Sequence, residues 1–110
     1  MNLLILSNNI KTTYTSKNKL RVVLNEGSFI DIWYSEIDKK KFSYHWERTM
    51  IDGSIYWHDT TADIRWKNIK TFPKHFHNGN YENVIESDLS DTPLIAIRQF
   101  LSFILTKLNN

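Results

Sequence analysis

Four histidines are the side chains of this 110-residue chain best suited to chemistry near neutral pH, and they share its middle third: His45, His58, His75 and His77. Imidazole titrates at about pH 6.5, so one histidine can accept a proton while another donates one. On RNA, the first would take the 2′-hydroxyl proton and the second would protonate the leaving oxygen. Lys or Arg would stabilise the charge that develops on phosphorus. The histidines therefore suggest metal-independent acid–base cleavage of RNA.

Two other interpretations of the same histidines stay open. His75 and His77 are spaced like a ligand pair on a strand, and with His45, His58 or Asp59 they could bind zinc as part of a metal-dependent hydrolase. Alternatively, all four are structural and lie on a sheet whose core is rich in Trp and Tyr. The sequence by itself does not choose among the three.

The distribution of charge suggests an anionic ligand. Residues 39–77 contain eight basic and four acidic residues, a balance of +4, whereas residues 1–38 balance to zero and residues 78–110 to −2. Three of the four Trp residues lie in the same segment. Positive charge next to aromatic side chains suits RNA, and we expect a hollow of positive potential. In this hypothesis Arg65 and Lys74 hold phosphate and Asp59 orients an imidazole.

The composition excludes several other classes. There is no Cys, hence no disulfide and no thiol nucleophile, and the three isolated Gly residues form no phosphate-binding loop. No Gly-x-Ser-x-Gly motif is present, and the apolar runs are far shorter than the roughly 18 residues that span a membrane. The first residues do not resemble a signal peptide. We expect a single cytoplasmic domain over residues 1–110 that needs no cofactor.

Two β-hairpins and a C-terminal helix must position these residues. Runs rich in β-branched and aromatic residues, separated by turn signals, predict strands at 20–24, 29–34, 41–48 and 54–59, with a further short strand at 82–86. Apolar residues recur at helical spacing after Pro93, from Leu94 to Leu108. The predicted fold is α+β: a curled antiparallel sheet of four to five strands with the C-terminal helix packed on one face.

The Asp52-Gly53 turn also predicts a register for the second hairpin. If the turn has two residues, His45 lies opposite Thr60 and Glu47 lies opposite His58. Side chains alternate along a strand, so His45, Glu47 and His58 would then share one face. By the same alternation, His75 and His77 project to one side of an extended segment.

Five sequence elements occur in a recognisable order: Phe-Ser-Tyr-His-Trp at 42–46, Trp-His-Asp at 57–59, Arg-Trp-Lys at 65–67, Thr-Phe-Pro-Lys-His-Phe-His-Asn-Gly at 71–79, and a Pro-led apolar helix. Taken together, they resemble the TumE-like toxin family of bacterial and archaeal type II toxin–antitoxin systems, over roughly residues 12–108. The resemblance implies a small cytoplasmic toxin, directed at RNA or translation, that a helix-turn-helix antitoxin neutralises. The resemblance is also compatible with a homo-oligomer.

The family motifs match this chain residue by residue at Tyr44, His45 and Trp46, at His58 and Asp59, and at Pro73, His75 and His77. Tyr44 is thereby implied as a substrate contact of an endoribonuclease. The chain departs from the pattern around Asp59, where Trp57 replaces an expected Arg and Thr60 an expected Asn. Ala62-Asp63 replaces an expected Pro-His. These departures keep open a degenerate toxin, which would be a non-catalytic nucleic-acid-binding or regulatory module.

Overall fold

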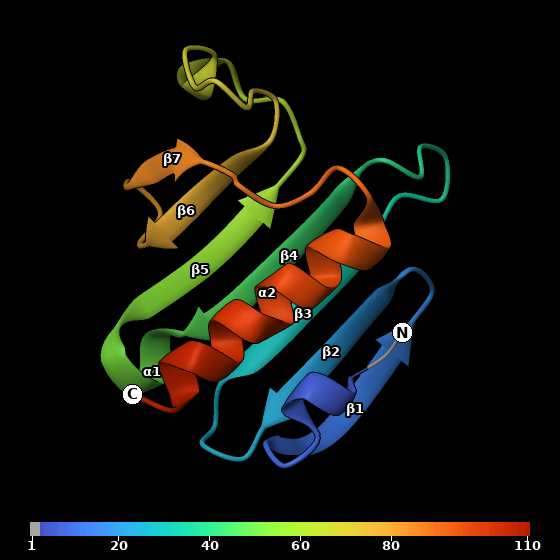
Figure 1. The fold of residues 1–110 in the computed structure, drawn as a ribbon, viewed down its shortest axis with the longest axis vertical. Helices are drawn as coiled ribbons and strands as arrows, with labels where there is room; N and C mark the ends of the chain where they lie inside the picture. The colour runs from blue at the N-terminus through green and yellow to red at the C-terminus, as the bar shows by residue number, and fades with distance from the viewer. Residues whose placement is uncertain (1–2) are drawn as a thin grey trace.

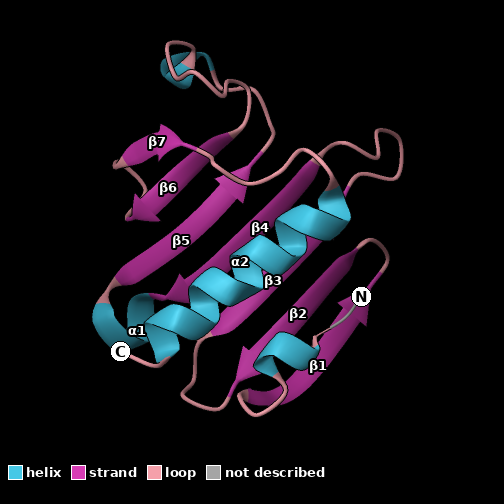
Figure 2. Ribbon diagram, in the orientation of Figure 1, coloured by secondary structure: helices cyan, strands magenta, loops and turns pink. Residues whose placement is uncertain are grey.

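The computed structural model describes residues 3–110, which form one seven-stranded antiparallel sheet with a long helix across one face (Figures 1 and 2). The strands lie in the sheet in chain order: β1 (Ile10–Ser16), β2 (Lys19–Leu24), β3 (Phe29–Tyr34), β4 (Phe42–Arg48), β5 (Ser54–Asp59), β6 (His75–Gly79) and β7 (Val84–Glu86). The predicted α+β class is confirmed. The predicted count of four to five strands is wrong, because β1 and β6 are additional strands, whereas the short strand predicted at 82–86 is present as β7.

Helix α2 (Pro93–Leu108) covers the middle of the sheet, where it lies along β3 and β4 (Figure 1). Pro93 begins the helix, as predicted, and its fixed φ suits that position. The buried side chains of α2 are Ala96, Ile97, Phe100, Leu101 and Ile104, whereas Leu94 is 74% exposed. The apolar stripe therefore begins one turn later than its spacing suggests. A short 3-10 helix, η1 (Leu4–Leu6), inserts Leu6 into the same core.

The core lies between α2 and one face of the sheet. Alternate residues of β2, β3 and β4 point toward the helix and are fully buried, namely Val22, Leu24, Ile30, Ile32, Phe42, Tyr44 and Trp46. Burial of such side chains is the main stabilising contribution to a domain of this size. Within residues 3–110, no helix of the length of α2 covers the opposite face of the sheet, although the irregular segment after β5 packs against it at β6, where Trp66 contacts His77. We call this opposite face the open face.

The connection between β4 and β5 differs from the predicted two-residue turn. It is the short helix α1 (Thr49–Asp52) followed by Gly53 in the left-handed region, at φ 77°. His45 consequently lies opposite Trp57 instead of Thr60, a displacement of three residues, and His58 lies opposite Tyr44. An odd displacement exchanges the two faces of a strand. The predicted grouping of His45, Glu47 and His58 on one face is therefore wrong.

Residues 60–74 form the irregular segment between β5 and β6, with the 3-10 helix η2 (Ile64–Trp66) at its centre. The Asp63 side chain accepts a hydrogen bond from the Arg65 backbone N–H and so begins η2. Among residues 3–110, no helix is both long and apolar enough to cross a membrane.

Candidate functional site

Strand alternation brings three of the four histidines to the open face. His45 in β4, Trp57 in β5 and His77 in β6 are direct cross-strand neighbours, and Asp59 lies opposite His75 in the same way. Neighbours in register share a face of a sheet. We call His45, Asp59, His75 and His77 the histidine cluster. The prediction that His75 and His77 point to the same side is confirmed.

Ring contacts hold the cluster together. The rings of His75 and His77 have centroids 5.0 Å apart and nearly perpendicular planes. His77 stacks on the indole of Trp57 at 4.6 Å, and His45 lies on the other side of the same indole at 5.3 Å. The Trp57 N–H donates to the Ser43 hydroxyl group at 2.7 Å, which fixes the indole in place. Trp57 is thus the spacer between His45 and the His75–His77 pair.

Hydrogen bonds assign the tautomers of the pair. The Nδ1 atom of His75 is 2.9 Å from the Pro73 carbonyl oxygen, and the Nδ1 atom of His77 is 2.9 Å from the Tyr81 carbonyl oxygen. A carbonyl oxygen only accepts, so each ring donates from Nδ1. In the neutral form of each ring, Nε2 therefore carries the lone pair. The two Nε2 atoms are the basic groups of the pair.

His45 has the opposite arrangement. Its Nε2–H group donates a hydrogen bond to a carboxylate oxygen of Glu47, with the two atoms 3.2 Å apart. The two residues are on the same strand and the same face, because they are two positions apart. The bond contributes to the lowered pKa of Glu47, although hydrogen bonds from Thr49 contribute more. Glu47 therefore orients the ring of His45.

Burial keeps His77 neutral. The protein interior disfavours the charged imidazolium, which lowers the pKa of His77 below its ordinary value. The Tyr81 carbonyl acts in the opposite direction, and the proximity of His75 lowers the pKa of His77 further. A neutral His77 with a free Nε2 has the properties of a general base.

A hollow of about 310 Å³ opens beside the pair, between β5, β6 and the segment that contains η2. Aromatic side chains make up much of its wall: Trp57, Trp66 and Tyr81. Its charged side chains are Asp59, Asp63, Arg65 and Glu82. Carboxylates thus outnumber the single guanidinium, which differs from the expected positive potential. Most basic residues of the 39–77 segment lie outside the lining.

Arg65 is paired within the hollow. Its guanidinium donates to both carboxylate oxygens of Asp63, at 3.1 Å to Oδ1 and 2.6 Å to Oδ2. These hydrogen bonds lower the pKa of Asp63 to about 2 and raise the pKa of Arg65. The Arg65 side chain is 72% exposed and that of Asp63 is 29% exposed, so water screens the pair and a phosphate can compete for the guanidinium. Arg65 is therefore placed at the hollow, with part of its charge already neutralised.

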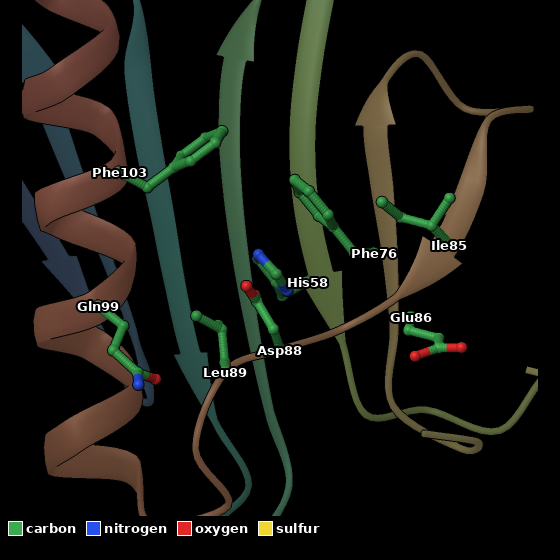
Figure 3. Close-up of a pocket in the computed structure, with 8 residues that line it drawn as sticks. All are labelled: His58, Phe76, Ile85, Glu86, Asp88, Leu89, Gln99 and Phe103. Atoms are coloured by element: carbon green, nitrogen blue, oxygen red, sulfur yellow. The ribbon is translucent and has the colours of Figure 1, made fainter. Parts of the chain in front are cut away.

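His58 lies on the opposite face, against α2. Its ring stacks on Phe76 with centroids 3.9 Å apart, and its Nδ1 atom is 2.7 Å from the Ser87 hydroxyl oxygen. Figure 3 shows His58 and Phe76 in a pocket that α2 borders through Phe103 and Gln99. Burial lowers the pKa of His58 to about 3, so this ring is a neutral packing element near pH 7.

Tyr44 and Lys74 also lie away from the hollow. The Tyr44 hydroxyl group is 2.6 Å from that of Tyr34 beneath α2, and burial raises its pKa. The Lys74 ammonium group donates to the Leu89 carbonyl oxygen and to the Asp91 carboxylate, the latter at 2.9 Å. Of the eight residues that the sequence singled out, the structure thus brings together His45, Asp59, Arg65, His75 and His77. It places Tyr44, His58 and Lys74 elsewhere.

Trp57 and Tyr81 line the hollow but were not among the predicted site residues. The correct β4–β5 register would have placed Trp57 between two histidines. Tyr81 follows β6 in a turn and contributes through its backbone carbonyl as well as its ring, for which the sequence carries no signal. Within residues 3–110, no three His, Asp or Glu side chains are grouped so that they could hold a metal ion.

The fold and the site together define a small α+β protein in which histidines, carboxylates and aromatic rings line a hollow on the open face of the sheet. A family model described as toxin TumE matches residues 2–108, nearly the whole chain, so the protein belongs to this toxin family. Its role is that of a toxin, and the family suggests an antitoxin as its partner. No curated protein and no solved structure matches the chain.

Proposed function

We propose that this toxin cleaves RNA as an endoribonuclease, with His75 and His77 as an acid–base pair and without a metal ion. The observation that supports this proposal most strongly is the geometry of the pair. The two rings lie 5.0 Å apart beside one hollow, and carbonyl groups hold both Nδ1 atoms so that both Nε2 atoms are left to react. Two imidazoles at this distance can contact the same phosphodiester group.

The pair would act in a single transesterification. Nε2 of neutral His77 takes the proton of the 2′-hydroxyl group, and the 2′-oxygen attacks phosphorus. A 2′,3′-cyclic phosphate forms as the bond to the 5′-oxygen breaks, and that oxygen takes the proton from Nε2 of protonated His75. One proton is accepted and one is donated, so the pair keeps its total charge. We assign the base to His77 because its lowered pKa keeps it neutral.

The neighbouring groups support these roles. Asp59 lies opposite His75 in register and favours the charged form of His77, so it stabilises the imidazolium that proton transfer creates. Arg65 is the cation of the hollow and would exchange part of its contact with Asp63 for the phosphate. His45, beyond Trp57, would contact the nucleotide next to the cleaved bond.

Growth arrest tests the pair. The wild-type gene and the variants His75→Ala, His77→Ala and His58→Asn are expressed under one inducible promoter, with soluble protein measured for each. We expect growth arrest with the wild type and with His58→Asn, which changes the matched histidine on the other face. We expect no growth arrest with His75→Ala or with His77→Ala. Arrest that persists in both His75→Ala and His77→Ala would remove the pair from the mechanism.

Purified protein and total RNA test the chemistry. Cleavage should continue in the presence of a chelator and should leave 2′,3′-cyclic phosphate ends. Loss of cleavage on chelation would instead favour a metal-dependent hydrolase. RNA that is bound but left intact would favour the second candidate, a non-catalytic RNA-binding or regulatory module, with binding that weakens steeply as salt rises. The pairing of Arg65 with Asp63 is the observation in favour of that candidate.

The partner and the location are proposed from the family resemblance. We propose a cytoplasmic protein that a helix-turn-helix antitoxin binds and neutralises. Co-expression with a short helix-turn-helix gene from the same locus, followed by affinity purification, should recover a complex and restore growth. Size-exclusion chromatography of the toxin alone would show whether it forms a homo-oligomer.

A further inference from the structure

We propose that Trp33 is a stacking platform for one base of a single-stranded RNA, which extends across the open face away from the histidine cluster. The inference rests on the proposed function and specifies its substrate class. It assigns to the toxin a binding subsite in addition to the place where the bond is cut.

Sheet register places Trp33 in line with the cluster. Lys19, Trp33, Ser43, Asp59 and His75 are successive cross-strand partners from β2 to β6, so they form one row on the open face. Three strand spacings separate Trp33 from His75, which is about 14 Å. A strand of RNA with its scissile phosphate at the His75–His77 pair would reach Trp33 within a few nucleotides.

The surface between them is hollowed. A second hollow, of about 410 Å³, is lined by Lys19, Asp31, Trp33, Ser43 and His45 on one side. It shares Trp57, Asp59 and Thr61 with the hollow at the His75–His77 pair. The two hollows therefore adjoin across these three side chains, and we call them together the depression. A chain of nucleotides that extends from one hollow to the other would run over Trp57, Asp59 and Thr61.

The side chain of Trp33 has no polar or aromatic partner within residues 3–110. It makes no hydrogen bond, ring contact or cation–π contact there, although it is half-buried on the open face. The other three Trp residues all have such contacts: Trp46 with Ser28, Trp57 with Ser43 and Trp66 with His77. An indole that lines a hollow and has no aromatic partner of its own is a surface on which a nucleic-acid base can stack.

Charge at this end of the depression favours a phosphate. The Lys19 ammonium group and the Arg21 guanidinium share one carboxylate, that of Asp31, at 3.2 Å and 2.7 Å. Two cations against one anion leave an excess of positive charge beside Trp33. The carboxylates around the His75–His77 pair supply no such attraction, so binding energy for the strand would come from the Trp33 end.

The platform requires single-stranded RNA. In a duplex both faces of a base are stacked on its neighbours, and a side chain cannot take their place without unpairing the base. An unpaired base can lie flat on the indole while its phosphate meets Lys19. We therefore expect the toxin to prefer single-stranded RNA of several nucleotides over both duplex RNA and a dinucleotide.

Fluorescence anisotropy with uncleavable probes tests this inference. The probes are 2′-O-methyl RNAs of two and eight nucleotides, which lack the attacking hydroxyl group. Trp33→Ala should weaken binding of the longer probe at least about fivefold and leave the dinucleotide unaffected. Trp33→Tyr should retain most of the affinity because it keeps a ring. Leu94→Ala, an exposed apolar residue on the α2 side, is the control and should change nothing.

Trp33→Leu provides a second variant that preserves the apolar contact with the sheet, and thermal unfolding confirms that each variant is folded. Unchanged affinity of folded Trp33→Ala or Trp33→Leu for the eight-nucleotide probe would overturn the platform, even if the wild type cleaves RNA. An equal loss of affinity for the two-nucleotide and the eight-nucleotide probe would also overturn the platform. A wild type that neither binds nor cleaves RNA would instead refute the proposed function itself.

Discussion

Replacement of His58 by Asn should remove much of the acid sensitivity of the fold. His58 is 3% exposed and its pKa is lowered to about 3, from an ordinary value of 6.5, chiefly because burial disfavours the imidazolium. The unfolded chain therefore binds a proton below pH 6.5 that the folded protein refuses until about pH 3. The contribution of His58 to the free energy of unfolding is fully present above pH 6.5 and decreases as the pH falls from 6.5 toward about 3.

The magnitude follows from the difference in pKa. Each pH unit inside the window is equivalent to about 1.36 kcal/mol, so between pH 7.5 and pH 5 the wild type should lose about 2 kcal/mol through His58 alone. His58→Asn cannot take up the proton and keeps a polar atom near the Ser87 hydroxyl group. We expect its free energy of unfolding to fall by about 2 kcal/mol less than that of the wild type over the same range.

Urea denaturation at pH 7.5, 6, 5 and 4.5 measures this difference. His77→Asn is the matched control. The pKa of His77 is lowered as well, but its ring is less deeply buried, so this variant should reduce the pH dependence of the free energy of unfolding by a smaller amount. If His58→Asn and the wild type lost stability in parallel as the pH falls, the lowered pKa inferred from the burial of His58 would be refuted.

Two further substitutions test local features of the fold. Gly53→Ala should lower the free energy of unfolding by about 1 kcal/mol in thermal denaturation, because Gly53 has φ 77° and a Cβ atom disfavours this conformation; an unchanged melting temperature would contradict the observed β4–β5 connection. Lys74→Met should cost about 1 kcal/mol, since it leaves the Leu89 carbonyl oxygen without its ammonium donor. RNA cleavage by folded Lys74→Met should be unchanged, and its loss would show that Lys74 reaches the substrate.

Elements with strong local signals could be predicted from the sequence. Helix α2 begins at Pro93 as expected, and β3 and β5 have the predicted bounds of 29–34 and 54–59. In each case the signal lies within the element or at its ends: a helical repeat of apolar residues, or β-branched and aromatic runs that stop at a turn. Such signals do not depend on where the rest of the chain lies.

Strand β1 carries no signal of this kind. Five of its seven residues are exposed and none is fully buried, because it is an edge strand that the core does not cover completely. Without a buried face, no alternation of apolar and polar residues is required. Its sequence, Ile-Lys-Thr-Thr-Tyr-Thr-Ser, shows this directly. The strand forms because β2 offers it a partner, which is a property of the tertiary structure.

The same distinction explains which part of the site could be predicted. His75 and His77 are two residues apart on one strand, so any extended conformation places them on the same side. The relation of His45 to His58 depends instead on the connection between β4 and β5. That connection runs over residues 49–53, and the register it sets places Trp57 between His45 and His77 and sends His58 to the core. The length of a turn several residues away thus decides whether a histidine lies on the face with the candidate site or packs in the core. Within a strand the assignment is fixed by alternation, but between strands it requires the register, which Asp52-Gly53 alone did not determine.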